Sequence, residues 1–299
     1  MSEMTCRFGT VLQDYYLDKV RSVNARRDAR FAAMQTREDV LDYIAEVREK
    51  IAAAFPMPEE RGVTPEVVVT SAREYDKFRM ECVIYYSRPG YPVTANLYLP
   101  KVDGKVPAVI VACGHSPNGK ARDFYSKAGI TFAEMGYAAL VVDPVGQGER
   151  WQFVNVPDAF EVDGRCTHEH NMTGKLLSLT GEFFGAWRVY DLIRGLDYLL
   201  SLPQVDASRV GITGTSGGGT LTAFTQALEP RFTMAAPSCY ITSWQRNIEN
   251  EIPADIEQMP PGLLAEGLEM GDLLLPLAPR PILILGQDND FFDPRGTVE

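Results

Sequence analysis

The 299-residue sequence has few histidines, no paired cysteine motif and no long apolar run. Its five cysteines are scattered and never spaced as C-x-x-C, which excludes a disulfide framework or a cysteine-type zinc site and indicates reduced thiols. The opening residues, MSEMTCRFGTVLQDYY, lack a basic segment followed by an apolar core, so no secretory signal is expected. No uncharged apolar stretch approaches the ~18 residues that span a bilayer. We therefore expect a cytoplasmic protein with no membrane partner.

Positive charge is also scarce, because 29 Lys and Arg face 40 Asp and Glu for a formal net charge of −11. This balance argues against a broad surface for nucleic acid or anionic lipid. The hydrophobic fraction of 45% and charged fraction of 23% are typical of a globular protein with a sizeable core. The length suits one large α/β domain or two ordinary ones.

The first part of the chain, residues 1–65, is predicted to be a helical extension. REDVLDYIAEVREKIAAAF carries apolar residues at helical spacing, and PMPEERGVTPE then ends the pattern with prolines and a glycine. We expect this extension to pack on the main domain, residues 66–299, or on a second subunit of a homo-oligomer.

The main domain has the pattern of an α/β fold. Segments 79–88 and 91–100 indicate antiparallel strands, and the apolar runs at 106–114, 137–150, 209–216, 234–241 and 280–288 indicate strands, several of them buried on both faces. Helical segments at 123–136 and 186–202 alternate with them, and 259–275 is expected to be a helical flap or core helix. The pattern predicts a mainly parallel sheet with helices on both faces. Four polar loops then meet at one rim, where such sheets bind ligands: ACGHSPNG, DPVGQGER, GTSGGG and GQDNDFFD.

The glycine cluster GITGTSGGGT has three possible interpretations. A phosphate-binding P-loop needs a lysine after the last glycine, but Gly219 is followed by Thr220. No glycine starts the i, i+2, i+5 pattern of a dinucleotide site. The pattern G-x-S-x-G does fit, as residues 214–218 between a strand and a helix, and it places the Ser216 hydroxyl at a strained turn. We therefore predict that Ser216 is a nucleophile.

A serine nucleophile needs donors for the oxyanion and a base that an acid orients. The backbone N–H of Gly217 is the first predicted donor. The second is expected from His115 or Ser116, because the following Pro117 has no N–H.

Three aspartates in GQDNDFFDP compete for the place of the acid. We favour Asp290, which precedes Pro294 by four residues. Asp288 is the reserve, and Asp293 suits a role in capping the turn.

The ordered set of motifs resembles the α/β-hydrolases, and most closely their acetyl xylan esterase-like group. The stretches that carry the resemblance are SRPGYPVTANLYLP, GHSPNGK, MGYAALVVDPVGQGER, DLIRGLDYLLSLPQVDASRVGITGTSGGGT, APSCYITS and RPILILGQDNDFFDPRGT. The resemblance implies a serine carboxylic-ester hydrolase that forms an acyl-enzyme, with no metal or organic cofactor. It also implies small-molecule ester substrates such as acetylated sugars. A peptidase of the same fold is the nearest enzymatic alternative.

The histidine base of the fold is missing from its expected place after the acid. The sequence ends nine residues beyond Asp290, and His115, His168 and His170 all precede Ser216. H-x-H in THEHN is weak support for a metal, so no metal site is predicted, and His170 is not favoured as a substitute base. The resemblance instead implies that Glu169 and His170 help to order their loop.

We expect that the domain is C-terminally truncated and lacks the last strand and helix of the fold. Loss of the base would then lower turnover by roughly 10⁴–10⁶-fold, as in the subtilisin series. The alternative is a degenerate hydrolase retained as a binding or scaffold protein.

Other side chains near the rim are predicted to shape or support the site. Trp151 and Trp244 are expected to line an apolar acyl or sugar pocket. Asp143 and Arg150 are interpreted as a salt bridge or turn anchor.

Overall fold

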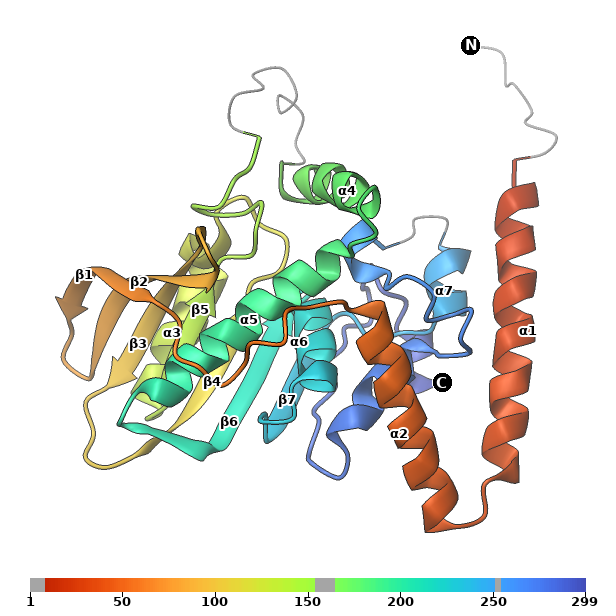
Figure 1. Ribbon diagram of the computed structural model, residues 1–299, viewed down its shortest axis with the longest axis horizontal. Coiled ribbons are helices and arrows are strands. Elements are labelled where there is room, and N and C mark those ends of the chain that lie inside the picture. Colours follow the sequence, from red (N-terminus) through yellow and green to blue (C-terminus); the bar gives the residue numbers. More distant parts are fainter. Residues whose placement is uncertain (1–8, 154–164, 251–253) are drawn as a thin grey trace.

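Seven strands of the described chain form one central sheet (Figure 1). The computed structural model describes residues 9–153, 165–250 and 254–299. In chain order the strands are β1 (Val67–Glu74), β2 (Phe78–Arg88), β3 (Tyr91–Pro100), β4 (Val106–Ala112), β5 (Ala138–Val142), β6 (Val205–Thr215) and β7 (Met234–Ser238). Their spatial order is β1-β2-β3-β5-β4-β6-β7. Strands β5, β4, β6 and β7 are parallel, and the antiparallel β1–β3 form one edge. The predicted α/β architecture is confirmed.

Helices cover both faces of this sheet. They are α1 (Val11–Ala33), α2 (Arg37–Ala54), α3 (Asp123–Glu134), α4 (Arg165–Ser178), α5 (Phe184–Ser201), α6 (Gly217–Leu228), α7 (Trp244–Glu249) and α8 (Arg295–Val298). Three short 3₁₀ segments are η1 (Gly119–Ala121), η3 (Ile256–Gln258) and η4 (Met270–Leu277). One hydrophobic core joins α2, α5 and α6 to the sheet, and a second joins α3 to the opposite face.

Strand β4 shows why its sequence is a continuous apolar run. Ile110 and Ala112 belong to the larger core, whereas Val109 and Val111 belong to the core beneath α3. Because successive side chains of a strand point to opposite faces, a strand covered on both sides needs apolar residues at every position. The strand therefore ends deep in the molecule, and its polar continuation at 113–120 emerges at the rim.

The N-terminal helices pack on the main domain and share its larger core. Thr36 and Asp39 form a capping box that starts α2. At the contact with η4, Arg27 of α1 makes two 2.8 Å hydrogen bonds to Asp272, and the Tyr43 hydroxyl of α2 donates a third at 3.0 Å. The Asp272 side chain is fully buried. This packing agrees with the expectation that the extension packs on the main domain. That residues 1–65 form a separate domain stays a prediction.

The structure differs from the expected elements in three places. Strand β1 was not predicted. The segment 259–275 is not a single helix, because regular structure within it begins only at η4. The run at 280–288 is not a full strand, since it joins β7 through two parallel bridges, Ala235 to Ile282 and Ser238 to Leu285. Its side chains at Leu283 to Leu285 are 40–50% exposed.

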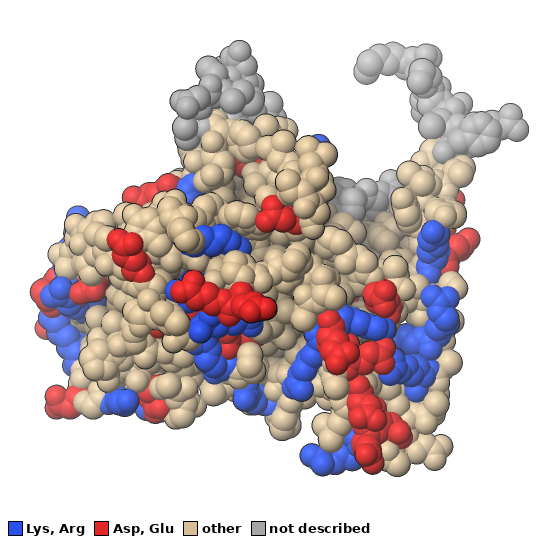
Figure 2. Space-filling model, in the orientation of Figure 1, with Lys and Arg blue, Asp and Glu red and all other residues tan. Residues whose placement is uncertain are grey.

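Acidic and basic side chains alternate on the face drawn in Figure 2, and no extended basic area is seen on that face. Part of this mixture comes from α1 and α2, where Glu46 pairs with both Arg30 and Lys50. Among the described helices, none has the length and apolar character needed to cross a membrane.

We predict that Asp272→Asn lowers the free energy of unfolding by roughly 2–4 kcal/mol, because it leaves the Arg27 guanidinium without its buried counter-charge. Asp18→Asn is the matched control: its partner Arg21 and Asp18 itself are both exposed, so we expect a loss of less than about 0.5 kcal/mol. Urea denaturation followed by circular dichroism measures both. Equal stability of the two variants would contradict the role of Asp272.

Candidate active site

Ser216 lies at a sharp turn between β6 and α6. Its φ of 60° and ψ of −121° are unusual for a residue with a side chain, and its N–H donates a 2.9 Å hydrogen bond to the carbonyl of Ser238 at the end of β7. The side chain is partly exposed. We call residues 214–218 the elbow, since they have the strand–turn–helix geometry predicted from G-x-S-x-G.

The glycines of the elbow allow backbones to approach one another closely. A Cβ on Gly214 would lie 2.5 Å from the carbonyl oxygen of Ala112 in β4, and one on Gly218 would lie 2.2 Å from the same oxygen. A Cβ on Gly219 would lie 2.2 Å from the Ser238 carbonyl. Because these neighbours are backbone atoms, they cannot move aside cheaply. These glycines therefore allow the turn to fit between β4 and β7.

The loop that follows β4 contacts the elbow directly. A Cβ on Gly114 would meet the Thr215 carbonyl oxygen at 2.1 Å. The loop is held in place by Gln147, whose side-chain amide donates hydrogen bonds of 2.8 Å to the Gly114 carbonyl and 3.0 Å to the Ser116 carbonyl. The loop after β4 is thereby fixed at the carboxyl ends of the strands, with the elbow on one side and Gln147 on the other.

The predicted oxyanion donors belong to these two segments. Gly217 is the first residue of α6, where backbone N–H groups have no carbonyl of the preceding helical turn to bond. No hydrogen bond to a described residue uses the backbone N–H of His115 or Ser116. The structure thus brings all three candidates to one place, and the choice between His115 and Ser116 stays open.

Asp143 joins the loops after β4 and β5. Its carboxylate accepts hydrogen bonds from the Lys120 backbone N–H at 2.6 Å and the Thr94 hydroxyl at 2.7 Å, and it also pairs with the Lys120 ammonium. Burial tends to lower the pKa of Lys120, but Asp143 and Glu149 raise it overall. Arg150 donates to the Asp143 carbonyl at 3.0 Å. Both residues act as the turn anchor predicted from the sequence.

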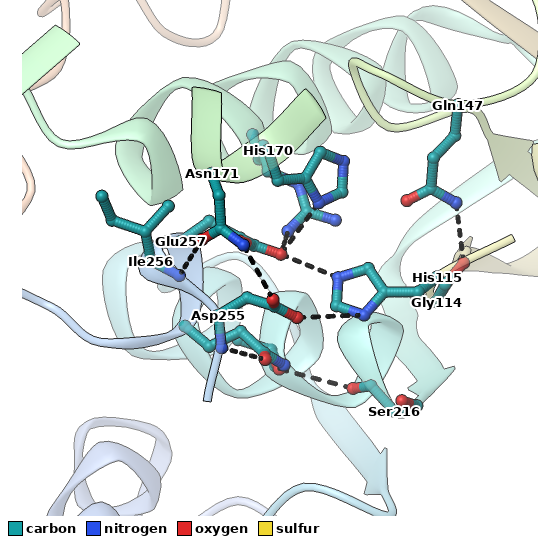
Figure 3. A network of polar contacts seen from close by, with 12 residues as sticks. Gly114, His115, Gln147, His170, Asn171, Ser216, Asp255, Ile256 and Glu257 are labelled. Carbon is teal, nitrogen blue, oxygen red and sulfur yellow. Dashed lines mark hydrogen bonds and ion pairs between the residues drawn. The ribbon is translucent and has the colours of Figure 1, made fainter. Parts of the chain in front are cut away.

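A buried carboxylate, Glu257 of η3, lies at the centre of the polar network beside the elbow (Figure 3). Its Oε1 atom is 2.7 Å from His115 Nε2, 2.9 Å from His170 Nδ1 and 3.0 Å from Arg188 Nη1. These partners come from the β4 loop, α4 and α5. A second carboxylate, Asp255, has Oδ2 3.6 Å from His115 Nδ1. We call these five residues the Glu257 network.

The charges of this network oppose the effect of burial. Burial alone would raise the pKa of Glu257, but His170, His115 and Arg188 lower it well below its usual range. Burial lowers the pKa of His170 to about 4. Burial and the neighbouring Glu257 together raise the pKa of Asp255. Glu257 is therefore an ionised carboxylate inside the protein.

The His115 side chain packs on the elbow. A Cβ on Gly217 would lie 2.9 Å from His115 Nε2, so the imidazole ring rests against the residue that follows Ser216. The sequence singled out His115 for its backbone N–H, and it gave no signal for its side chain. It also gave none for Glu257 or Arg188, because neither lies in a recognisable motif.

His170 and Glu169 order the loop after β5, as the resemblance implied. Glu169 Oε1 accepts hydrogen bonds from the backbone N–H groups of Gln152 at 3.1 Å and Phe153 at 3.0 Å. His170 Nε2 lies 2.9 Å from the Val145 carbonyl oxygen. The third histidine, His168, is exposed on α4.

The three candidate acids have different surroundings. Asp290 lies beside the thiol of Cys239, directly after β7, and burial together with this neighbour raises the pKa of Cys239. Asp293 is occupied by its pairing with Arg295, which lowers its pKa. Asp288 is exposed. Of the three, Asp290 lies near the end of β7 and is not paired with an arginine among the described residues. Its role as the acid stays a prediction.

The two predicted aromatic residues are placed differently. The indole N–H of Trp151 donates to the Pro117 carbonyl at 3.3 Å, which puts Trp151 beside the β4 loop. Trp244 is only 4% exposed and belongs to the larger core, with its indole N–H bonded to the Leu268 carbonyl. A substrate-contacting role for Trp244 finds no support in this placement, because its side chain is used in packing.

Comparison with known sequences places the chain in a family. The family model described as acetyl xylan esterase (AXE1) matches residues 58–255, about two-thirds of the sequence. The chain belongs to the acetyl xylan esterase family. It is 24% identical over 196 residues to YtaP of Bacillus subtilis (strain 168), a protein with a provisional hydrolase name. That match covers 61% of this chain and 59% of YtaP, so the chain spans less than two-thirds of this relative's length.

Several solved structures share the fold. A protein of Bacteroides fragilis NCTC 9343, provisionally named an acetyl xylan esterase, has a TM-score of 0.70 at 18% identity, over 83% of this chain and 69% of its own. Methylesterase BT1017 has a TM-score of 0.68 at 21% identity, over 92% and 56%. Acetyl xylan esterase 1 from Thermoanaerobacterium sp. JW/SL YS485 has a TM-score of 0.55 at 18% identity, over 87% and 82%. At these identities the likeness establishes the α/β-hydrolase fold.

We predict that Gly218→Ala destabilises the protein by at least about 2 kcal/mol, because its methyl group would overlap the Ala112 carbonyl. Gly211→Ala is the control in the same segment, since a Cβ there meets its nearest atoms at 3.7 Å, an ordinary contact. We expect the control to change stability by less than about 1 kcal/mol. Thermal unfolding of both variants measures the difference, and a fully stable Gly218→Ala protein would show that the backbones are less closely packed.

Proposed function

We propose that this protein is a serine carboxylic-ester hydrolase that removes small acyl groups, acetyl above all, from carbohydrate esters. The observation that carries the proposal is Ser216, held with φ of 60° at a turn between a parallel strand and a helix. Membership of the acetyl xylan esterase family supports the substrate class. The surrounding N–H groups of Gly217 and of His115 or Ser116 suit an oxyanion that forms during acyl transfer.

The proposed chemistry proceeds through an acyl-enzyme. The Ser216 hydroxyl transfers its proton to a base as its oxygen bonds to the ester carbonyl carbon, and the carbonyl oxygen becomes an oxyanion held by backbone N–H groups. Collapse of this intermediate breaks the bond to the alcohol, which leaves with the proton. Water then attacks the acyl-serine in the same manner and releases the carboxylic acid and free Ser216.

The fold expects an orienting acid and, after it in the sequence, a histidine base. We assign Asp290 as the acid, since its carboxylate lies near the end of β7 without an arginine partner. In the family order a histidine follows the acid, and none of the three histidines of this sequence does so. His115 and His170 are instead turned toward Glu257.

In a chain that also carries the histidine base expected after Asp290, we expect Ser216→Ala to abolish labelling by a fluorophosphonate probe and to reduce hydrolysis of 4-nitrophenyl acetate to the rate without protein. The probe phosphonylates an activated serine with loss of fluoride, so mass spectrometry should find the adduct on the peptide that contains Ser216. Ser208→Ala, which changes an exposed serine of the same strand, should label and react as the wild type does. Labelling that persists in Ser216→Ala would refute the assignment.

A substrate panel separates an esterase from a peptidase. With a chain that also carries the histidine base, we expect Ser216-dependent release of acetate from acetylated xylose and 4-nitrophenyl acetate, and no release of 4-nitroaniline from aminoacyl anilides. Amides are harder to cleave than esters. A peptidase would also need hydrogen-bonding groups that hold the main chain of a peptide. Chromatographic detection of acetate and absorbance of 4-nitroaniline provide the two measurements. Faster turnover of the anilides would favour the peptidase.

A further inference from the structure

Two histidine nitrogens and one carboxylate converge within the Glu257 network. The converging atoms of His115, His170 and Glu257 all lie within 4.8 Å of one another (Figure 3). They come from three segments that are separate in the sequence: the β4 loop, α4 and η3. Such convergence of buried lone-pair donors costs electrostatic energy unless a positive charge lies among them.

The outer nitrogen of each ring faces an acceptor. His170 Nε2 lies 2.9 Å from the Val145 carbonyl oxygen, which can only accept, so the ring hydrogen belongs there. A neutral ring then presents a lone pair on Nδ1 to Glu257 Oε1. In His115, Nε2 lies 2.7 Å from Glu257 Oε1 and Nδ1 lies 3.6 Å from the Asp255 carboxylate, and the tautomer with its hydrogen on Nδ1 has a lone pair on Nε2. In these tautomers both lone pairs are directed at the same carboxylate oxygen, Glu257 Oε1.

We propose that His115, His170 and Glu257 bind one divalent transition-metal ion of the zinc type. Two imidazole nitrogens and one carboxylate are a donor set that zinc accepts with three protein ligands, and they suit magnesium or calcium poorly because those ions prefer oxygen. Of the two histidines in the H-x-H motif only His170 takes part, because His168 is exposed on α4.

The surroundings resemble those of histidines that bind metals. Such histidines donate their second ring N–H to a backbone carbonyl or a carboxylate, which fixes the tautomer and the ring orientation. Val145 and Asp255 hold these two places. A Cβ on Gly146 would lie 3.0 Å from His170 Cδ2, so the absence of a side chain there lets the Val145 carbonyl reach the ring.

Arg188 is the group that competes most directly with a cation. Its Nη1 bonds Glu257 Oε1 at 3.0 Å, whereas Glu257 Oε2 is buried and has no hydrogen-bond partner among the described residues. Rotation of the carboxylate about its last bond lets one oxygen keep Arg188 while the other binds the ion. The neighbouring Asp255 adds negative charge that offsets the guanidinium.

An ion would reach the site from the side of His115. The His115 and Asp255 side chains are 16% and 24% exposed, whereas His170 and Glu257 are completely buried. Since the His115 ring rests on Gly217, the bound ion would fix that ring next to Ser216. The proposal does not depend on ester hydrolysis, because binding is measured directly.

The experiment is zinc binding by the full 299-residue chain after removal of metal with a chelator. We expect isothermal titration calorimetry to give one Zn²⁺ per chain and elemental analysis to find the same ratio after gel filtration. Zinc should also raise the melting temperature. His170→Gln and Glu257→Gln should each weaken binding by more than about 100-fold, since loss of an outer partner alone typically costs 10–100-fold.

Two control variants separate this site from other ligands of zinc. His168→Gln removes the exposed histidine of α4, and Cys166→Ser removes the thiol one turn before His170; both should bind zinc as the wild type does. Circular dichroism without metal tests whether each variant is folded. Zinc affinity that is unchanged in a folded Glu257→Gln protein, or no binding by the wild type, would overturn the proposal. Protons on the histidine rings would then supply the positive charge beside Glu257.

Discussion

The site depends on a close contact between two backbones. β4 and β6 are adjacent parallel strands, with Ala112 paired with Gly214, and the chain leaves both strands at the same rim. A Cβ at Gly114 or Gly218 would overlap carbonyl oxygens of the neighbouring segment. Only because these side chains are absent can the loop that carries His115 rest against the turn that carries Ser216. The strained conformation of Ser216 persists because the packing on both sides leaves no room to relax.

Glu257 extends this contact to the helices above the sheet. Three cationic or polar partners from the β4 loop, α4 and α5 share one of its oxygens. A buried carboxylate has a high cost of desolvation, which the groups around it must offset. Removal of any partner would therefore leave an incompletely compensated charge. The network is better understood as a device for fixing the segments around the elbow than as a source of net stability.

Much of the fold could be predicted from the sequence, because the central strands are buried on both faces and carry apolar residues at every position. The elbow could also be predicted, since glycine spacing directly reflects the close approach of backbones. The Glu257 network could not, because its partners are separated by up to 142 residues and obey no local spacing. Trp244 shows the opposite failure: its proximity to a rim loop in sequence suggested substrate contact, while its packing in the core is a tertiary property. β1 was missed because it is mostly exposed and lacks the apolar run of a buried strand.

The N-terminal helices are connected to the rim through η4. Glu269, just before η4, accepts hydrogen bonds of 2.9 Å from the Trp244 backbone N–H at the start of α7, and Asp272 within η4 binds Arg27 and Tyr43 of the extension. Gln226 of α6 donates to the Leu273 carbonyl, so the helix that begins at the elbow contacts the same segment. One short 3₁₀ segment thus joins α1 and α2 to α6 and α7. Because α6 starts at Gly217, a loss of this docking would loosen the far end of the helix that holds the elbow. The described part of the extension is therefore a structural support of the site, because its contacts with Asp272 hold η4 in place.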